Sequence, residues 1–325
     1  MKSLRRRELL VLAATGLTTS GVSSWAEGDY PNRPIRLVIP FAPAGPTDIF
    51  GRLFGAKLSD TLGQPVVPDN RAGAGSAIGM DIVAKAAPDG YTLAFGTGSI
   101  PTGAAMTKLP YDPRKDIDPI ALLGIVPLVL LAAPNMPNNL PGLIELIKKN
   151  PGKYSFGSAG NGTTTHLAGE MLKQKAGLDV VHVPYRGSGP ALQDTMAGRQ
   201  AFLFETITAS KALFTSGKLQ LLAIGTKKRI ALMPDVPTLA EGGVMGMSAT
   251  TWNMLFAPAN TPRTIIDRLN KASNQILAQP AFVRQLADLA TEAVSDSTPE
   301  SARAFLLGEM NSWAEVVKLA GIKPE

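Results

Sequence analysis

Four short loops rich in glycine, serine and threonine are the segments whose residue types could bind a small molecule. Glycine lets a bound group approach the backbone closely, and serine and threonine hydroxyls add adjustable hydrogen-bond donors. Three of the loops lead into predicted helices, whose first amides are unpaired and whose dipole is positive at that end. Such loops can hold an anion such as a carboxylate without an arginine. The loops are Phe41–Asp48, Gly96–Ser99, Ser158–His166 and Tyr185–Gly189.

An acidic residue joins these loops at the end of an apolar segment. Residues 201–205 read as a buried strand, and Glu205 is its last residue. A buried carboxylate without a partner is energetically costly, so Glu205 either has a polar partner or orients a ligand. For Asp48, a structural role is the favoured alternative to ligand binding: its carboxylate can cap the following helix or bond to N–H groups of the loop. The predicted ligand-binding residues are Phe41, Ala42, Ala44, Gly45, Thr47, Asp48, Thr97, Gly98, Ser158, Ala159, Gly160, Asn161, Thr163, Thr164, Thr165, His166, Tyr185, Gly187, Ser188 and Glu205.

Catalysis is the competing use of the same residues. The nucleophile motif G-x-S-x-G of serine hydrolases does not occur, and the chain has two histidines, His166 and His182. His182 alternates with valines in a predicted strand, which favours a structural role. His166 starts a predicted helix after Ser158, so a hydrolase built on Ser158, His166 and an acid is the rival hypothesis. We predict no catalytic residues.

Metal and cofactor sites have little support in the sequence. The chain has no cysteine, which excludes disulfides and thiolate ligands. His166 and Glu170 have the i, i+4 spacing of two ligands on one helix face, but no third ligand is nearby, so a solvated helix face explains them better. The glycines around Gly73-Ala74-Gly75 do not match the dinucleotide motif G-x-G-x-x-G. We therefore predict neither a metal nor a cofactor.

The elements that must position the loops alternate between apolar strands and amphipathic helices. Two such α/β units occupy roughly residues 28–125 and 135–225, and helices dominate after residue 262. Units of this length imply parallel strands, with ligands beyond the C-terminal strand ends. The predicted strands are 35–41, 66–67, 91–96, 154–157, 180–184, 201–205 and 219–225, and the predicted helices are 47–62, 76–87, 140–150, 163–176, 189–197, 208–216, 262–278, 281–289 and 299–319.

Two apolar segments, 120–133 and 247–258, are the predicted crossings between two lobes. We therefore predict an α/β protein with mainly parallel sheets around a central cleft. Lobe 1 comprises residues 27–125 and 250–325, and lobe 2 comprises residues 126–249, with approximate crossings.

The N-terminus predicts export. Lys2 and Arg5–Arg7 precede a short apolar stretch, and Ser24-Trp25-Ala26 fits a signal-peptidase site, so residues 1–26 are the predicted signal peptide. The apolar stretch is too short and too rich in Thr, Ser and Gly to span a membrane. The paired arginines leave both the Sec and the twin-arginine routes open. We predict a periplasmic monomer.

The charge pattern gives nucleic-acid binding little support. The formal net charge is +6, but residues 1–26 hold four basic residues and one acidic residue, which leaves +3 for the remainder. No run of Lys and Arg interleaved with aromatic residues occurs. The small positive excess attracts anionic small molecules only weakly.

Several sequence blocks occur in order along the mature chain. They include Tyr30-Pro31-x-Arg33-Pro34-Ile35-Arg36, Pro40-Phe41-x-x-x-Gly45-x-Thr47-Asp48, Pro88-Asp89-Gly90-Tyr91-Thr92-Leu93, Ser158-x-Gly160-x-Gly162-x-x-x-His166-Leu167 and His182-Val183-Pro184-Tyr185-x-Gly187. Through these blocks the chain resembles the Bug family of tripartite tricarboxylate transporter receptors. The resemblance covers essentially the whole mature chain.

The resemblance implies a type II-like periplasmic-binding-protein fold whose two α/β lobes close on a ligand by hinge motion. It implies a solute-binding protein that captures a small carboxylate: a di- or tricarboxylate, an aromatic acid or an amino acid. Its partners would be the membrane subunits of a tripartite tricarboxylate transporter. A ligand-sensing adaptor for a membrane sensor kinase is the alternative. Family members hold their ligands mainly through loops 41–48 and 158–166.

Two positions depart from the family pattern. Ala44 stands where the family commonly has glycine, which places a Cβ beside the anion-binding loop. Glu205-Thr206 stands where the family often has Asp-Asn. The longer glutamate side chain should shrink or repolarise that end of the cleft, so these positions are where ligand identity is expected to differ.

Overall fold

The strands of the chain join into a continuous sheet in the order β2-β1-β3-β9-β4-β7-β5-β6, with β8 and β10 also paired to β4. This computed structural model describes residues 30–230 and 232–319, so the predicted signal peptide lies outside the described residues. The strands are β1 (Ile35–Ile39), β2 (Val66–Asn70), β3 (Thr92–Thr97), β4 (Ile117–Ala132), β5 (Tyr154–Ser158), β6 (Val180–Pro184), β7 (Phe202–Thr206), β8 (Gln220–Ile224), β9 (Thr250–Pro258) and β10 (Glu292–Ala293).

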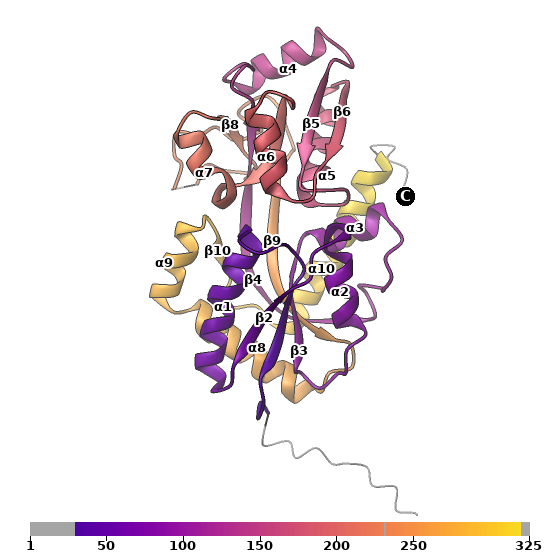
Figure 1. Cartoon of the computed structure of the whole chain (residues 1–325), viewed down its shortest axis with the longest axis vertical. Helices are drawn as coiled ribbons and strands as arrows, with labels where there is room; N and C mark the ends of the chain where they lie inside the picture. Colours follow the sequence, from indigo (N-terminus) through magenta and orange to yellow (C-terminus); the bar gives the residue numbers. More distant parts are fainter. Residues whose placement is uncertain (1–29, 231, 320–325) are drawn as a thin grey trace, which may run out of the picture. The chain divides into compact units, whose positions relative to one another are not determined.

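Strand direction divides the sheet into two sections (Figure 1). In the first section β1 pairs in parallel with β2 and β3, and in the second section β5 pairs in parallel with β6 and β7. The long strands β4 and β9 pair antiparallel with their neighbours. Residues 117–127 of β4 pair with β9, whereas residues 128–132 pair with β7 and β8. The parallel pairing predicted for the α/β units is confirmed for β1, β2 and β3 and for β5, β6 and β7, whereas β8 pairs antiparallel with β4. β4 joins the two sections.

The predicted lobe boundaries at residues 125–126 and 249–250 fall beside this change of partner in β4. The predicted first crossing, 120–133, is the greater part of β4, and the predicted return, 247–258, contains β9. Division of the chain into two lobes that move relative to each other stays a prediction.

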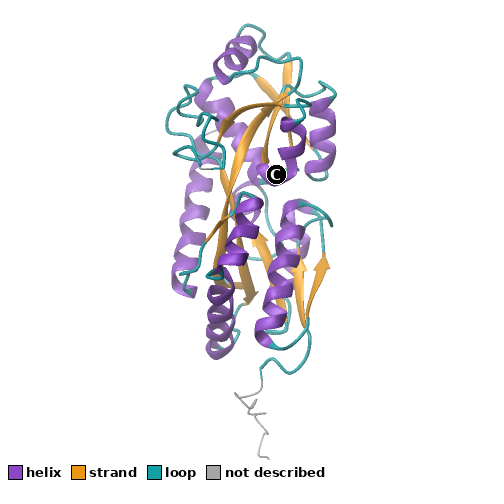
Figure 2. Ribbon diagram, turned by 90° about the vertical axis from the view of Figure 1, so that its left-hand side faces the viewer, coloured by secondary structure: helices purple, strands orange, loops and turns teal. Residues whose placement is uncertain are grey.

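Helices lie on both sides of the strands (Figure 2). None of those in residues 30–230 and 232–319 has the length and apolar character that a bilayer crossing requires. The predicted helices agree closely with the observed ones, except that the predicted helix 76–87 is observed as the shorter α2, preceded by a 3-10 turn. The helices are α1 (Pro46–Leu62), η1 (Ala74–Ser76), α2 (Ala77–Ala84), α3 (Ser99–Met106), α4 (Leu140–Lys148), α5 (Thr164–Ala176), α6 (Ser188–Met196), α7 (Ile207–Thr215), α8 (Arg263–Leu277), α9 (Pro280–Asp288) and α10 (Pro299–Leu319).

One helix, α3, was not expected from the sequence. It has 8 residues and contains Pro101 and Gly103, both poor helix formers. Proline is tolerated here because it lies in the first turn, where a backbone donor has no partner inside the helix. This helix matters for function, because it follows the Gly96–Ser99 loop and turns that loop into a helix start like the other three.

Each sheet section has its own hydrophobic core. The first section packs Val38, Ala94 and Phe256 with α2 and α10, and the second packs Phe156, Phe202 and Phe204 with α4 and α5. Every residue of β7 is buried, as expected for a strand with packing on both faces. Packing on both faces therefore fixes the C-terminal end of β7, where Glu205 lies.

Three backbone segments, from β4, from the residue after β8 and from the residue before β9, meet where the two sections join. Gly225 N donates to Leu128 O at 2.7 Å, Ala249 N donates to Gly225 O at 2.7 Å, and Leu128 N donates to Ala249 O at 3.1 Å. A Cβ built on Gly225 would lie 2.1 Å from Ala249 O, so the close approach of these backbones requires glycine.

Two tryptophans share one acceptor on the long C-terminal helix. Trp252 of β9 donates its indole N–H to Glu309 Oε2 at 3.0 Å, and Trp313 of α10 donates to the same oxygen at 3.2 Å. Both side chains are buried. The pair ties α10 to the strand that also carries Thr251 and Asn253.

Candidate ligand-binding site

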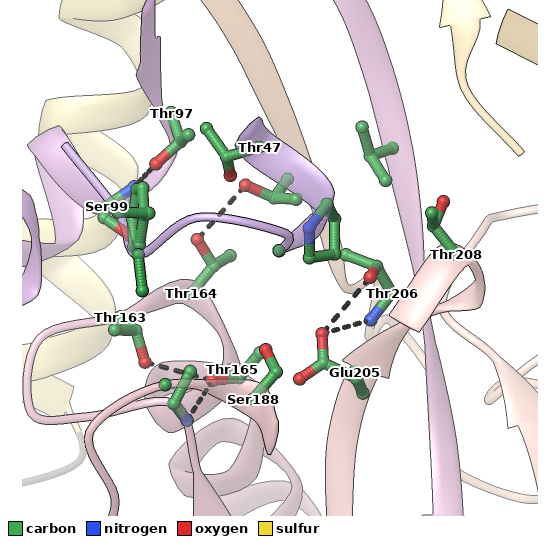
Figure 3. A pocket seen from close by; sticks show the side chains of 18 of the residues that line it. Thr47, Thr97, Ser99, Thr163, Thr164, Thr165, Ser188, Glu205, Thr206 and Thr208 are labelled. Carbon is green, nitrogen blue, oxygen red and sulfur yellow. Dashed lines mark hydrogen bonds between the residues drawn. The ribbon is translucent and has the colours of Figure 1, made fainter. Parts of the chain in front are cut away.

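A cavity of about 370 Å³ is lined by loops and strand ends from both sheet sections. Its size lies within the usual range for small-molecule sites, which is about 300–1,000 Å³. Threonine and serine side chains dominate its polar lining (Figure 3). The cavity is therefore built to hydrogen-bond a small polar molecule.

Five helices begin at this cavity, because residues at or beside the N-termini of α1, α3, α5, α6 and α7 line it. The first amides of a helix have no partner inside it, and the helix dipole is positive at that end. Several N-termini that meet at one cavity create a positive potential without many cationic side chains. This arrangement favours an anion.

Most of the predicted ligand-binding residues line the cavity. They come from all four loops and from the end of β7, which fits the rule that ligands lie beyond the carboxyl ends of parallel strands. Contact between these residues and a ligand stays a prediction. The lining residues among them are Phe41, Ala42, Ala44, Gly45, Thr47, Thr97, Ala159, Thr163, Thr164, Thr165, Gly187, Ser188 and Glu205.

The other predicted residues do not line the cavity. They are Asp48, Gly98, Ser158, Gly160, Asn161, His166 and Tyr185. Each belongs to a loop that reaches the cavity, and Asn161 is exposed. Each loop thus contains residues that line the cavity and residues that do not.

Asp48 anchors the first loop from inside α1. Its carboxylate accepts hydrogen bonds from Ala44 N at 2.8 Å, from Asn70 Nδ2 at 2.8 Å and from Arg52 Nε at 2.8 Å. Burial alone would raise the pKa of Asp48, but these hydrogen bonds outweigh it and hold the pKa below its usual value. The carboxylate therefore stays charged and fixes the loop, which is the structural role considered as its alternative.

Gly98 lets two cavity loops approach each other. A Cβ on this residue would lie 2.8 Å from Thr251 Oγ1 and 3.0 Å from Thr164 Oγ1. These two hydroxyls lie 3.3 Å apart, so the first sheet section meets the start of α5 directly behind Gly98. Thr102 of α3 adds a second link, because its hydroxyl donates to Gly162 O at 2.5 Å.

Ser158 is bonded to His182 rather than to His166. Ser158 Oγ and His182 Nε2 lie 2.6 Å apart, and Ser158 is fully buried. Gly160 N donates to the same hydroxyl at 3.2 Å. The Ser158–His166 pair of the rival hydrolase is therefore not formed, and Ser158 does not line the cavity.

His166 bonds to its own loop. It was predicted to bind the ligand, but it does not line the cavity. Gly162 N donates to its Nδ1 at 3.3 Å, and its ring stacks on His182 with centroids 3.7 Å apart. Burial lowers the pKa of His166 to about 4, assisted by the charge of Lys173. Burial also lowers the pKa of His182 to about 3, assisted by His166 and Lys173. Both rings are therefore neutral at pH 7, which suits acceptors of loop hydrogen bonds.

His166 and Glu170, the two possible metal ligands on one helix, have no third ligand beside them in the described part of the chain. His166 Nε2 and Glu170 Oε1 lie 4.0 Å apart inside the protein. Within residues 30–230 and 232–319, no group of three or more His, Asp or Glu side chains is placed to hold a metal ion. Glu170 is buried rather than on a solvated helix face, and burial raises its pKa while Lys173 partly offsets that effect.

Thr163, Thr164 and Thr165 form the start of α5 at the cavity. Thr163 is the N-cap residue and accepts from His166 N at 3.3 Å, while its hydroxyl lies within hydrogen-bond distance of both Gly160 O and Thr165 Oγ1. Thr165 Oγ1 also accepts from Ala159 N at 3.0 Å. The network holds the loop and the helix start as one rigid surface.

Tyr185 and its neighbours organise the fourth loop. Its hydroxyl donates to Asp194 Oδ2 at 2.7 Å and accepts from Gln200 Nε2 at 2.9 Å. Its amide donates to Ser158 O at 3.1 Å, and Gly187 N donates to Ala159 O at 3.0 Å. The third and fourth loops, 158–166 and 185–189, are thereby tied together, and Arg186 is left exposed at the cavity lining.

Glu205 is the acid of the cavity. It is 2% exposed, and its Oε1 accepts from Thr206 N at 2.7 Å and from Thr206 Oγ1 at 3.2 Å. Burial raises its pKa, and the nearby Ser188 hydroxyl and the Thr206 donors offset only part of that rise. The side chain therefore lies in the cavity lining with its charge incompletely compensated.

Sequence reasoning missed lining residues outside the glycine-rich loops. Thr206 and Thr208 begin α7, Thr251 and Asn253 lie on β9, and Leu289 and Thr291 precede β10. The N-cap signal of Thr206, which accepts from Ala209 N, was available in the sequence. The β9 and β10 residues reach the cavity only through the antiparallel pairing of β4, which no local pattern predicts.

Sequence comparison identifies relatives along nearly the whole chain. The family model of the tripartite tricarboxylate transporter family receptor matches residues 50–322. Protein BugT of Bordetella pertussis is 38% identical over 320 residues, which cover 97% of this chain and 98% of BugT.

Solved structures share the fold. The periplasmic binding protein BugD has a TM-score of 0.85 and 35% identity, over 91% of this chain and 100% of BugD. An R. palustris protein solved with adipate has a TM-score of 0.86 and 33% identity, over 91% of this chain and 100% of that protein. These likenesses confirm the predicted periplasmic-binding-protein fold and the resemblance to the Bug proteins. The chain belongs to the tripartite tricarboxylate transporter receptors, a family of solute-binding proteins.

Proposed function

We propose that this protein captures a small carboxylate in the 370 Å³ cavity and carries it without chemical change. The observation that carries the proposal is the meeting of helix N-termini and threonine and serine hydroxyls at that cavity. Backbone amides and hydroxyls at helix starts bind carboxylate oxygens well. The relative solved with adipate supports the same ligand class.

The proposed mechanism is closure of two lobes on the ligand, with residues 27–125 and 250–325 in one lobe and 126–249 in the other. The cavity takes its lining from both, so a ligand that touches both sides stabilises the closed arrangement. β4 and the segment that enters β9 are the two connections in which hinge rotation would occur.

The proposed setting is the periplasm, reached through a Sec or twin-arginine signal in residues 1–26. The proposed partners are the membrane subunits of a tripartite tricarboxylate transporter. A sensor kinase is the alternative partner, and the two are distinguished by which of them binds the liganded protein. We propose a monomeric receptor.

A ligand screen tests the proposed function. The chain is expressed with its own N-terminus, purified after export, and melted with di- and tricarboxylates, aromatic acids, amino acids, neutral sugars and polyamines. A carboxylate present at 100 times its Kd should stabilise the protein by about 2.7 kcal/mol. Stabilisation by sugars or polyamines alone would overturn the proposal.

Thr164→Val is the matched variant for this screen. It keeps the shape of a lining side chain but removes a hydroxyl at the start of α5. We expect weaker carboxylate binding with little loss of stability in the ligand-free protein. Thr61→Val in α1 is the control, because its hydroxyl bonds to Lys57 O and it does not line the cavity.

A turnover assay addresses the hydrolase rival. Esters and amides of the carboxylates that bind are incubated with the protein and with His166→Ala. We expect no product from either protein, since Ser158 is buried and bonded to His182. Product formation that the substitution abolishes would favour the hydrolase.

A further inference from the structure

We infer that the cavity selects carboxylates that also carry a hydrogen-bond donor, a hydroxyl or an ammonium group, and that Glu205 receives this donor. The inference rests on the proposed function and specifies the class of ligand. It starts from an oxygen of Glu205 that the protein leaves without a donor.

The two oxygens of Glu205 differ in their surroundings. Oε1 accepts both donors of Thr206, its backbone amide and its hydroxyl. Oε2 is inaccessible to solvent and accepts no hydrogen bond from the described residues. In Figure 3 it points away from Thr206 toward Ser188, another lining residue, although the two side chains form no hydrogen bond of normal geometry. The unpaired acceptor therefore faces Ser188, within the lining of the cavity, and a ligand donor would reach it beside that side chain.

An ionised carboxylate accepts hydrogen bonds and donates none. Leaving one of its oxygens buried and unpaired is costly, and a ligand donor at that position removes the cost. The position is fixed, because β7 is buried along its whole length and Thr206 holds the other oxygen. The donor must therefore come to Glu205.

The same residue disfavours a ligand that carries only carboxylates. A second carboxylate near Glu205 would place two negative groups together in a site from which water is excluded. The lining contains one cation, Arg186, which is exposed and forms no ion pair within the described part of the chain. Arg186 and the helix starts can receive the ligand carboxylate, and Glu205 can receive the donor.

Ligands with a common carbon skeleton test this inference by calorimetry. Succinate, malate and aspartate differ by hydrogen, hydroxyl or ammonium at one carbon, and adipate, 2-hydroxyadipate and 2-aminoadipate repeat the comparison at six carbons. In the better-fitting series, the wild-type protein should bind a donor-bearing acid about 10- to 100-fold more tightly than the plain diacid. The hydroxyl and ammonium arms identify which donor the site takes.

Glu205→Gln should reduce that ratio to within about threefold, because the neutral amide loses the charge that strengthens the hydrogen bond. Glu205→Asp is a second variant. It keeps the charge, but its side chain is one methylene shorter, which moves the carboxylate away from the ligand donor. It should also lower the ratio. Glu170→Gln is the control, because Glu170 is a buried acid outside the cavity lining. It should leave the ratio unchanged.

An unchanged ratio in both Glu205 variants would overturn the inference and leave the proposed function intact, as would equal affinity of the wild-type protein for plain and donor-bearing acids. Failure of every carboxylate to bind would instead remove the proposed function, and this inference with it. Thermal melts of each variant show whether a lost preference reflects the site or the fold.

Discussion

Ala44 occupies a backbone conformation that suits glycine. Its φ is +64°, in the left-handed region, and its amide is held by Asp48 Oδ2 at 2.8 Å. A residue with a Cβ pays about 1–2 kcal/mol in that region. The strained residue lines the cavity. The loop is therefore less stable than it would be with glycine, and it presents a methyl group to the ligand site.

Ala44→Gly should relieve this strain. We expect a gain of up to about 1 kcal/mol in the free energy of unfolding, since the greater freedom of glycine in the unfolded chain offsets part of the relief. Denaturant titration measures it. Ala42→Gly is the matched control in the same loop, because Ala42 is not in the left-handed region and glycine there should be neutral or destabilising. Equal effects of the two substitutions would contradict the strain at Ala44.

The stacked histidines predict a loss of stability in mild acid. Their pKa values fall to about 4 and about 3 in the folded protein, whereas unfolded histidine has a pKa of about 6.5. The unfolded chain therefore binds more protons as the pH falls from 6.5 toward 4, and stability decreases through that window. His166 alone contributes at most about 3 kcal/mol.

Glu170 and Glu205 act in the opposite direction, because burial raises their pKa values. Comparison with His166→Gln therefore isolates the histidine contribution. Denaturant titrations at a series of pH values should show a shallower fall between pH 6.5 and 4 for this variant. Parallel curves for the variant and the wild-type protein would contradict the neutral, buried state of His166.

At the scale of elements, capping of α5 links stability to the site. Thr163 caps α5 and lines the cavity. Asn139 caps α4, which does not line the cavity, and the Asn139 side chain accepts a hydrogen bond from Gly142 N at 2.8 Å. Loss of either cap should cost about 0.5–2 kcal/mol of stability.

Thr163→Ala should in addition weaken ligand binding, whereas Asn139→Ala should not. Thermal melts give the stability, and calorimetry with the acid that binds best gives the affinity. Equal loss of affinity in both variants would show that capping acts on the site only through global stability.

Local patterns in the sequence predict the helices and most strands of this fold, since each has a clear apolar period and clear caps. β6 begins and ends where predicted, at Val180 and Pro184. The patterns also predict which loops reach the cavity, because parallel strands bring their carboxyl ends to one edge. They do not predict α3, whose proline and glycine obscure its period.

The sequence also does not predict which residues of a loop line the cavity and which do not. Ser158, Thr163 and His166 have similar polar character, yet only Thr163 lines the cavity. That outcome depends on His182, which comes from another strand and bonds to Ser158. Long-range pairing, rather than local pattern, decides which side chain faces a ligand.

At the scale of the whole molecule, the connection between the sheet sections depends on one glycine. Gly225 lies where the backbones of three segments meet at the join between the sections, and a Cβ would lie 2.1 Å from Ala249 O. Gly225→Ala should therefore destabilise the protein by about 1–3 kcal/mol or more, as expected for overpacking against backbone.

Gly308→Ala is the opposite case. Gly308 lies within α10 with no atom within 4 Å of a built Cβ, so alanine there should stabilise the helix by about 0.5–1 kcal/mol. Denaturant titration compares both variants. Tolerance of alanine at residue 225 would show that the crossing can open at little cost.

The shared acceptor of Trp252 and Trp313 gives the protein an internal optical probe. The chain has three tryptophans, and the third, Trp25, belongs to the predicted signal peptide, so the tryptophan emission of the exported protein would come only from these two. Trp252 lies between Thr251 and Asn253, both of which line the cavity, and its indole is bonded to the helix behind. A ligand that shifts β9 relative to α10 would alter both indole environments at once, so capture and release can be followed in real time from native emission without attaching a dye.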